Sequence, residues 1–221
     1  PGKPLTIIKG KSMISRVYNQ CLKAISKDSI YIATEDKRIA DHCKENNMQY
    51  LMTSEECLTG TDRLCEVSKL VDADYYINIQ GDEPLIPPEN IDLVIEPLLA
   101  RDDLSVSTLM IAIHNSSEML DPDICKVVVD NAGCALYFTR APIPYNRDFD
   151  YIEETYSDSK INLNKRILGF KHIGIYAYKK SFLPQFINMK VSKLENSEKL
   201  EQLRILENRY LIQLVETKQN S

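Results

Sequence analysis

Polar residues follow directly on an apolar run in the stretch YYINIQGDEP, residues 75–84. The run predicts a strand, and Gln80, Gly81 and Asp82 come straight after it. Ligands of open α/β sheets lie beyond the carboxyl ends of the strands, so Asp82 would point into such a crevice. A carboxylate there suits Mg²⁺, which prefers hard oxygen ligands and shares them with substrate phosphates. The alternative is a solvated turn that ends the strand.

Two further stretches could bind an anion at the backbone. The segment TGTDR, residues 59–63, precedes a predicted helix, with Thr59 or Thr61 as its N-cap. Free N–H groups at the helix start and the guanidinium of Arg63 would attract an anion, although a plain capped helix is the alternative. Lys3 lies in the loop sequence PGKP and could end a phosphate-binding loop, or it is an ordinary surface lysine.

Later in the chain, cationic and imidazole side chains suggest recognition of an acidic ligand. Arg140 and Arg147 flank the proline segment APIPYN and could bind a carboxylate or phosphate bidentately, or simply face solvent. His172 lies inside the apolar stretch GFKHIGIYAY, together with Tyr176. A single strand histidine is more typical of a satisfied core residue than of a catalytic group.

A helix is predicted over residues 195–210. A rotation of about 100° per residue places three leucines on one face. This apolar stripe consists of Leu200, Leu203 and Leu206. Gln202 then faces inward and Glu201 lies at the edge of the buried sector, where both need polar partners. Ser197 and Glu198 look like ordinary residues of the first turn.

The elements that must position these residues alternate in the first half of the chain. Helices are predicted over 13–25, 36–46, 61–71 and 88–100, and strands over 29–34, 48–53 and 75–80. Such alternation is typical of a parallel sheet covered by helices. Strands over 104–113, 125–129, 134–139 and 170–178 indicate an antiparallel insertion, and 211–217 is predicted to be a last strand. The polar segment 147–166 is predicted to be a mobile loop.

Composition excludes several classes of protein. The chain has 221 residues and a net charge of −5, without a basic stripe, which argues against nucleic-acid binding. No apolar run approaches the length of a membrane span. The six cysteines form no C-x-x-C pair, so neither zinc nor a disulfide framework is expected, and a reducing cytoplasm fits.

Taken in order, the motifs resemble those of the sugar-acid cytidylyltransferases. The matching segments are PGKPL (1–5), TGTDRL (59–64), NIQGDEP (78–84), ALYFTRAPIP (135–144), HIGIYAY (172–178) and LEQLRIL (200–206). The resemblance implies a three-layer, Rossmann-like α/β nucleotidyltransferase fold with a mostly parallel sheet. It also implies one domain over 1–221, in which 104–178 contains an antiparallel insertion used for dimerisation and sugar binding.

The resemblance implies transfer of CMP from CTP to the anomeric hydroxyl of 3-deoxy-manno-octulosonate, with release of pyrophosphate, for lipopolysaccharide or capsule synthesis. Asp82 would hold Mg²⁺, and Lys3 would contact phosphate as the second catalytic residue. Thr59 and Arg63 would lie on the cytidine side. The implied sugar-acid pocket consists of Gln80, Arg140, Arg147, His172, Tyr176, Glu201 and Gln202. A homodimer is also implied.

Two departures from the family pattern concern the chain ends. The family begins with a strand and a nucleotide-binding loop that carries Arg and Ser before Pro-Gly-Lys-Pro. It ends with Gly-Val-Asp-Thr, whose Asp is a second metal carboxylate. Neither segment is in the sequence, so we expect the natural protein to extend on both sides.

Two other functions stay open at this point. The enzyme could act on another sugar acid, such as the 8-amino analogue of 3-deoxy-manno-octulosonate (8-amino-Kdo) or a nonulosonic acid. Alternatively, the chain could be a non-catalytic module that binds a nucleotide or sugar.

Overall fold

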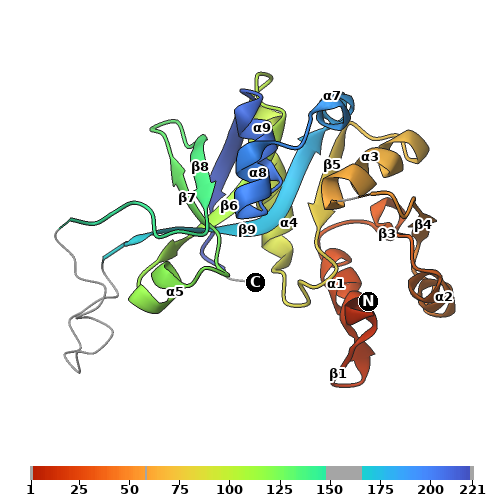
Figure 1. Cartoon of the computed structure of the whole chain (residues 1–221). Helices are drawn as coiled ribbons and strands as arrows, with labels where there is room; N and C mark the ends of the chain where they lie inside the picture. The colour runs from red at the N-terminus through yellow and green to blue at the C-terminus, as the bar shows by residue number, and fades with distance from the viewer. Residues whose placement is uncertain (1, 58, 148–165, 220–221) are drawn as a thin grey trace. The chain divides into compact units, whose positions relative to one another are not determined.

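The computed structural model describes residues 2–57, 59–147 and 166–219 (Figure 1). These residues form two compact units. Unit 1 comprises Pro1–Ser107, Gly174–Asn188 and Gln219–Ser221, and unit 2 comprises Thr108–Ile173 and Met189–Lys218. Most of the predicted mobile loop, residues 148–165, lies outside the described residues. The single domain over 1–221 stays a prediction, and unit 2 contains most of the predicted insertion 104–178.

Unit 1 alternates strands and helices as predicted. Its helices are α1 (Met13–Cys21), α2 (Lys37–Glu45), α3 (Gly60–Leu70), α4 (Pro88–Ala100) and α7 (Leu183–Asn188), with 3-10 turns at Lys3–Leu5, Lys27–Ser29 and Lys180–Phe182. Its strands are β1 (Ile7–Ile8), β2 (Lys11–Ser12), β3 (Ile32–Thr34), β4 (Tyr50–Met52) and β5 (Tyr75–Ile79). The α1 helix ends at Cys21 rather than at residue 25, because its last turn tightens into i→i+3 hydrogen bonds.

Side-chain caps explain where these helices begin. Ser12 accepts a hydrogen bond from the backbone N–H of Ser15 at the start of α1, and Asp36 does the same for Arg38 at the start of α2. Each cap satisfies a backbone donor that has no partner inside the helix. The α4 helix instead begins with Pro88, whose missing N–H costs nothing in the first turn.

Two strand pairings shape unit 1. Strands β3 and β4 run parallel, with Ile32 opposite Tyr50, which confirms the parallel pairing expected for this half of the chain. Strand β5 pairs antiparallel with the second part of β9 (Gly169–Lys179), with Tyr76 opposite Tyr178. A core cluster that includes Ile14, Tyr18, Ile32, Ile39 and Cys43 lies beneath β3 and joins α1 to α2.

Unit 2 is built mainly from antiparallel strands. Its elements are most of β6 (Val106–Ile113), α5 (Ser116–Leu120), β7 (Lys126–Val129), β8 (Ala135–Thr139), the first part of β9, α8 (Lys193–Glu198), α9 (Gln202–Glu207) and β10 (Ile212–Glu216). The strand order is β10-β6-β9-β7-β8, and β7 pairs antiparallel with both β8 and β9. The antiparallel pairing predicted for these strands is thereby confirmed, and the insertion over 104–178 stays a prediction.

The helix predicted over 195–210 is wrong in one respect, because the structure has two short helices there. Lys199 adopts a left-handed conformation with φ 55°, which ends α8 before α9 starts at Gln202. The sequence offers no glycine or proline at the break. The break accompanies a buried ion pair in which Arg204 of α9 reaches back to Glu195 of α8, with N–O distances of 2.5 and 2.8 Å.

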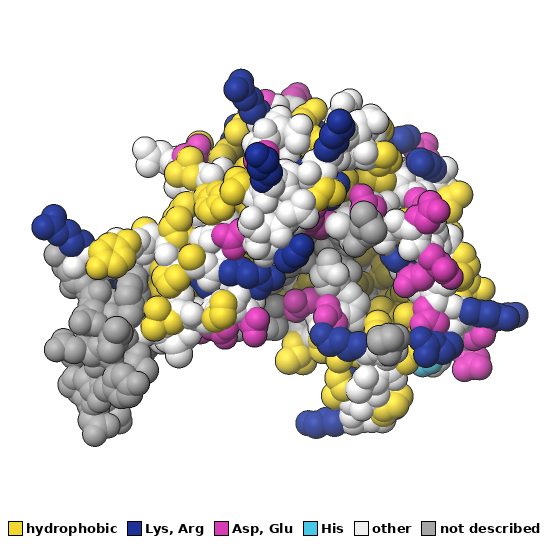
Figure 2. Space-filling view, viewed as in Figure 1, with side chains coloured by type: hydrophobic (Ala, Val, Ile, Leu, Met, Phe, Trp, Pro, Cys, Tyr) yellow, Lys and Arg dark blue, Asp and Glu magenta, His cyan; other side chains and the backbone are white. Residues whose placement is uncertain are grey.

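The described helices are all too short or too polar to cross a membrane. On the face shown in Figure 2, Lys and Arg side chains lie interspersed with Asp and Glu and form no continuous stripe.

The buried ion pair gives a stability prediction for unit 2. We expect Arg204→Met to lower the free energy of unfolding by about 3–5 kcal/mol, since it leaves the carboxylate of Glu195 buried and unpaired. The double variant Glu195→Leu/Arg204→Met should regain most of that loss. Chemical denaturation followed by circular dichroism measures both. Equal losses in the single and double variants would contradict the expectation.

Candidate functional site

The predicted site residues fall into both units. Unit 1 holds Lys3, Thr59, Arg63, Gln80, Asp82 and Tyr176, whereas unit 2 holds Arg140, Arg147, His172, Glu201 and Gln202. The nucleotide-side residues are therefore all in unit 1, and the sugar-acid residues are divided. Each group is described within its own unit.

A groove of about 910 Å³ runs through unit 1. One wall is formed by the chain around β3 and the other by β5, with α1 and α3 contributing further residues. Three of the predicted residues, Lys3, Arg63 and Gln80, line this groove. A second pocket of about 370 Å³ lies beside α1 and α2 and is lined by none of the predicted residues.

Lys3 and Asp82 meet although 79 residues separate them in the sequence. The Lys3 ammonium donates to Asp82 Oδ2 at 2.7 Å, and both side chains are well exposed. This hydrogen bond and the charge of Asp82 raise the pKa of Lys3. An exposed pair contributes little to stability, so a phosphate or a cation can separate the two side chains at small cost.

The chemistry of the donors decides whether Mg²⁺ fits at this place. Asp82 supplies one carboxylate, and no cluster of three or more metal-ligating side chains occurs among the described residues. Mg²⁺ is commonly held by one or two carboxylates together with substrate phosphates and water. Asp82 therefore fits a metal that arrives with a nucleotide, and does not by itself form a closed metal site.

The start of α3 is a capping box, which settles which threonine is the N-cap. Thr59 Oγ1 accepts a hydrogen bond from the backbone N–H of Asp62 at 3.1 Å. The Asp62 carboxylate in turn accepts one from the backbone N–H of Thr59 at 3.0 Å. Thr61 instead contacts the hydroxyl of Tyr178 at 3.1 Å. The capped-helix alternative accounts for the Thr59 side chain, and its contact with cytidine stays a prediction.

Asn78 and Gly60 belong to this site, although no role was predicted for them. A Cβ at Gly60 would approach the amide nitrogens of Asn78 and Gln80 to 3.2 Å, so glycine lets α3 begin against the end of β5. The Asn78 Nδ2 atom is buried and has no hydrogen-bond partner within the described residues. A buried donor beside a helix N-terminus suits an acceptor such as phosphate or a nucleobase carbonyl. The sequence feature that could have indicated a role for Asn78 was a single amide side chain inside an otherwise apolar strand.

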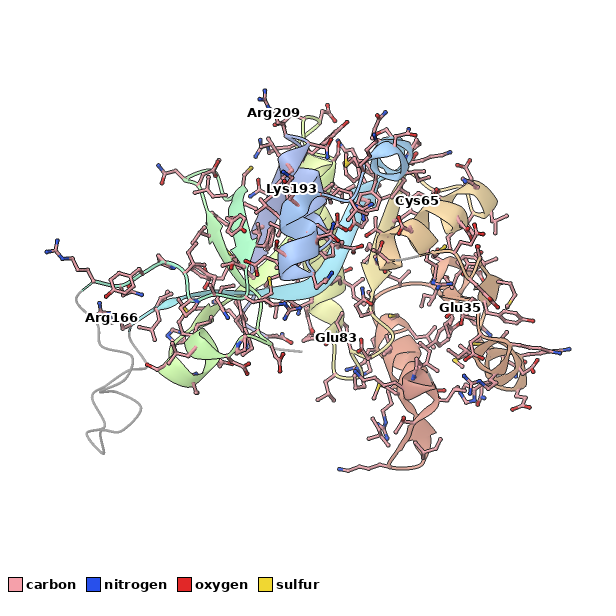
Figure 3. All side chains as sticks on the ribbon, in the orientation of Figure 1. Glu35, Cys65, Glu83, Arg166, Lys193 and Arg209 are labelled. Carbon is pink, nitrogen blue, oxygen red and sulfur yellow. The ribbon has the colours of Figure 1, made fainter. Side chains whose placement is uncertain are left out.

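Arg63 is already engaged by neighbouring loops. Its guanidinium lies 2.6 Å from Glu35, the residue labelled in Figure 3 after β3, and it also donates to the hydroxyl of Thr53. Both partners lie in loops that follow strands, so Arg63 ties these loops to α3. Its charge is partly compensated, and a direct contact with cytidine stays a prediction.

Arg140 is held in a different way in unit 2. Its Nε donates to the backbone carbonyl of Glu198 at 2.9 Å, and its Nη1 donates to the carbonyl of Pro122 at 3.0 Å. The Glu198 carboxylate accepts from the Thr139 hydroxyl at 2.6 Å and from the Arg140 backbone N–H at 2.9 Å. Carbonyls fix the direction of the guanidinium without neutralising it, so it keeps its charge for an anion.

Glu198 was predicted to be an ordinary first-turn residue, which is wrong. It joins α8 to the end of β8 through three hydrogen bonds. The prediction assumed one continuous helix, and the turn at Lys199 that brings Glu198 against β8 has no sequence signal.

His172 has its ring nitrogen satisfied, as expected for a core residue. The Thr108 hydroxyl lies 2.9 Å from His172 Nε2 and 3.2 Å from the carbonyl oxygen of Ile173. The ring packs edge-on against Phe138. Burial lowers the pKa of His172 to about 3, so the ring is neutral at physiological pH.

The remaining predicted residues have varied surroundings. Gln202 is buried, as predicted, and its amide donates to Cys125 Sγ at 3.8 Å. Glu201 is half-buried just before α9, and Arg147 is exposed. In unit 1, Tyr176 is buried and stacks on Tyr178, with ring centroids 5.7 Å apart.

The comparisons with known proteins agree on one family. The cytidylyltransferase family matches residues 1–213. The chain is 44% identical over 217 residues to the 3-deoxy-manno-octulosonate cytidylyltransferase of Syntrophotalea carbinolica, which covers 98% of this chain and 84% of that relative. It is 45% identical over 219 residues to the protein of the same name from Pelobacter propionicus, with the same two coverages.

A solved structure agrees with these relatives. The structure of CMP:2-keto-3-deoxy-manno-octonic acid synthetase complexed with CTP has a TM-score of 0.85 and 37% identity, and the match covers 98% of this chain and 83% of that chain. The α/β nucleotidyltransferase fold predicted from the sequence is thereby confirmed. This chain belongs to the cytidylyltransferase family.

Proposed function

We propose that the protein transfers CMP from CTP to the anomeric hydroxyl of 3-deoxy-manno-octulosonate and releases pyrophosphate, as a step toward lipopolysaccharide or capsule. The proposal is supported by two relatives named 3-deoxy-manno-octulosonate cytidylyltransferase and by the solved structure of CMP:2-keto-3-deoxy-manno-octonic acid synthetase. Each of these matches covers 98% of this chain. The observation in the structure that carries it is Arg140, whose guanidinium is oriented by two carbonyls and keeps its charge for a carboxylate.

On the nucleotide side, unit 1 binds and orients CTP. Lys3 contacts phosphate, and Asp82, which lies 2.7 Å from the Lys3 ammonium, would hold Mg²⁺. The metal supplies charge stabilisation at the phosphates when it is bound. Thr59 and Arg63 position the cytidine side of CTP through the start of α3.

On the sugar side, Arg140 and Arg147 receive the carboxylate, and neutral groups receive the hydroxyls. These neutral groups include the His172 ring and the Gln202 amide, and further contacts come from Gln80, Tyr176 and Glu201. The anomeric oxygen attacks the α-phosphorus and loses its proton, while the bond from that phosphorus to pyrophosphate breaks. Most of the rate enhancement comes from positioning and from charge stabilisation.

Two further properties form part of the proposal. All six cysteines are free thiols, which favours the reducing cytoplasm.

Unit 2 carries exposed apolar side chains on and after β8, the edge strand of its sheet. Leu136 is 62% exposed and Tyr145 is 82% exposed. We propose that a second copy of the chain covers them, and light scattering at micromolar concentration should give twice the chain mass. A monomer mass would remove the dimer.

The substrate is tested by release of pyrophosphate from CTP with a panel of sugar acids. We expect the highest kcat/KM with 3-deoxy-manno-octulosonate, and lower values with its 8-amino analogue and with nonulosonic acids. A preference for one of these acids would replace the substrate while keeping the reaction. Tight binding of both ligands without any pyrophosphate release would favour a non-catalytic binding module.

The metal role of Asp82 gives a second prediction. Asp82→Asn should lower kcat by about 100-fold or more while leaving the fold intact, since charge stabilisation at the phosphates is lost. Glu83→Gln, which changes the neighbouring acid (Figure 3), is the matched control and should stay close to wild type. Turnover of Asp82→Asn within a few-fold of wild type would remove Asp82 from the metal site.

The sugar-side roles of Gln80 and His172 give a further prediction. Gln80→Ala and His172→Ala should each raise the KM for the sugar acid more than the KM for CTP. Arg209→Ala, at an exposed position labelled in Figure 3, is the control. Because the pKa of His172 is about 3, the sugar-acid KM of the wild type should show no histidine transition near pH 6.5. Equal effects on both substrates would count against this assignment.

A further inference from the structure

The turn between α5 and β7, residues 121–125, bonds to three of the predicted sugar-acid residues. The carbonyl of Pro122 accepts from Arg140 Nη1 at 3.0 Å, and the carbonyl of Cys125 accepts from the His172 backbone N–H at 2.9 Å. The Cys125 sulfur accepts from the Gln202 amide at 3.8 Å. The position of this one turn therefore sets the positions of groups that come from three different elements.

Lys126 stabilises this turn through hydrogen bonds from the interior of unit 2. Its side chain is fully buried, and its ammonium donates to the carbonyls of Asp121 at 2.7 Å and Ile124 at 2.6 Å. These two carbonyls stand on either side of Pro122. Within the described residues Lys126 forms no ion pair with a carboxylate, and its ammonium donates to these two backbone carbonyls.

A fully buried lysine is costly, which makes stability a poor explanation for it. Removal of an ammonium from water carries a large penalty, and an apolar side chain of similar volume is often neutral or stabilising at such a site. Burial lowers the pKa of Lys126, and the nearby charge of Arg140 lowers it further, whereas Asp121, Glu198 and the Cys125 thiol oppose this. The fold thus keeps a second cation beside Arg140 at a cost.

We propose that Lys126 is a positioning residue for the sugar acid. Its ammonium holds the Pro122 carbonyl where it orients the Arg140 guanidinium, and its charge adds to the attraction for a carboxylate. The inference rests on the proposed function, in which Arg140 receives the carboxylate of the sugar acid. Lys126 itself is too deeply buried to touch the substrate.

Steady-state kinetics of the protein with CTP and 3-deoxy-manno-octulosonate test the inference. Lys126→Met should raise the KM for the sugar acid by about tenfold or more, because the guanidinium loses its orientation. The KM for CTP and the kcat at saturating sugar acid should stay within about threefold of wild type. Lys126→Arg keeps the charge and the donors and should regain most of the affinity.

Val127→Ala is the matched control, since Val127 is the next residue and is equally buried. It should lower the melting temperature without a selective effect on the sugar acid. An unchanged sugar-acid KM in Lys126→Met, or the same KM change in Val127→Ala, would overturn the inference.

A measurement on the wild type covers the case in which Lys126→Met does not fold. Titration of 3-deoxy-manno-octulosonate into ¹⁵N-labelled protein should shift the Arg140 Nε–H and the Lys126 backbone resonances at the same ligand concentration. A shift at Arg140 without one at Lys126 would refute the positioning role and leave the proposed function standing. No shift at either residue, together with no turnover, would refute the proposed function itself.

Discussion

A cation that is to receive an anionic ligand must be held in place without being neutralised. In unit 2 backbone carbonyls meet this requirement for Arg140, whose guanidinium bonds to Glu198 and Pro122. Carbonyl dipoles fix direction and leave the net charge intact. Arg204 shows the opposite arrangement, because Glu195 pairs with it bidentately in the core. The choice of partner therefore separates a binding arginine from a structural one within a single unit.

Unit 1 meets the same requirement through solvent exposure. The pair of Lys3 and Asp82 is formed between exposed side chains, so water screens it and other partners can replace each member. A neutral group of this unit is the buried amide nitrogen of Asn78, which has no hydrogen-bond partner within the described residues. Neutral donors and acceptors can orient a nucleotide without adding to the charge that the metal must balance.

The sequence predicted the parts of the site that depend on local pattern. A threonine cap at residue 59 or 61, a strand that ends just before Gly81 and the burial of Gln202 follow from residue type and periodicity, and the structure has Thr59 as the cap, β5 ending at Ile79 and Gln202 buried. It could not predict the role of Glu198, because the helix wheel assumed regular geometry through Lys199. Nor could it predict Lys126, since lysine is almost never fully buried and only tertiary carbonyls make its burial tolerable.

Charge alone cannot distinguish one sugar acid from another, because every member of the class carries a carboxylate. Discrimination must come from the groups that contact the hydroxyls. The proposed pocket offers both donors and acceptors for them, among them Glu201, Gln202 and the His172 ring. The His172 ring contacts the Thr108 hydroxyl at 2.9 Å, and burial lowers the pKa of His172 to about 3, so the ring is uncharged at physiological pH. A protonated ring would add a further cation to unit 2, so the burial of His172 would let the ring meet a sugar hydroxyl as a neutral group.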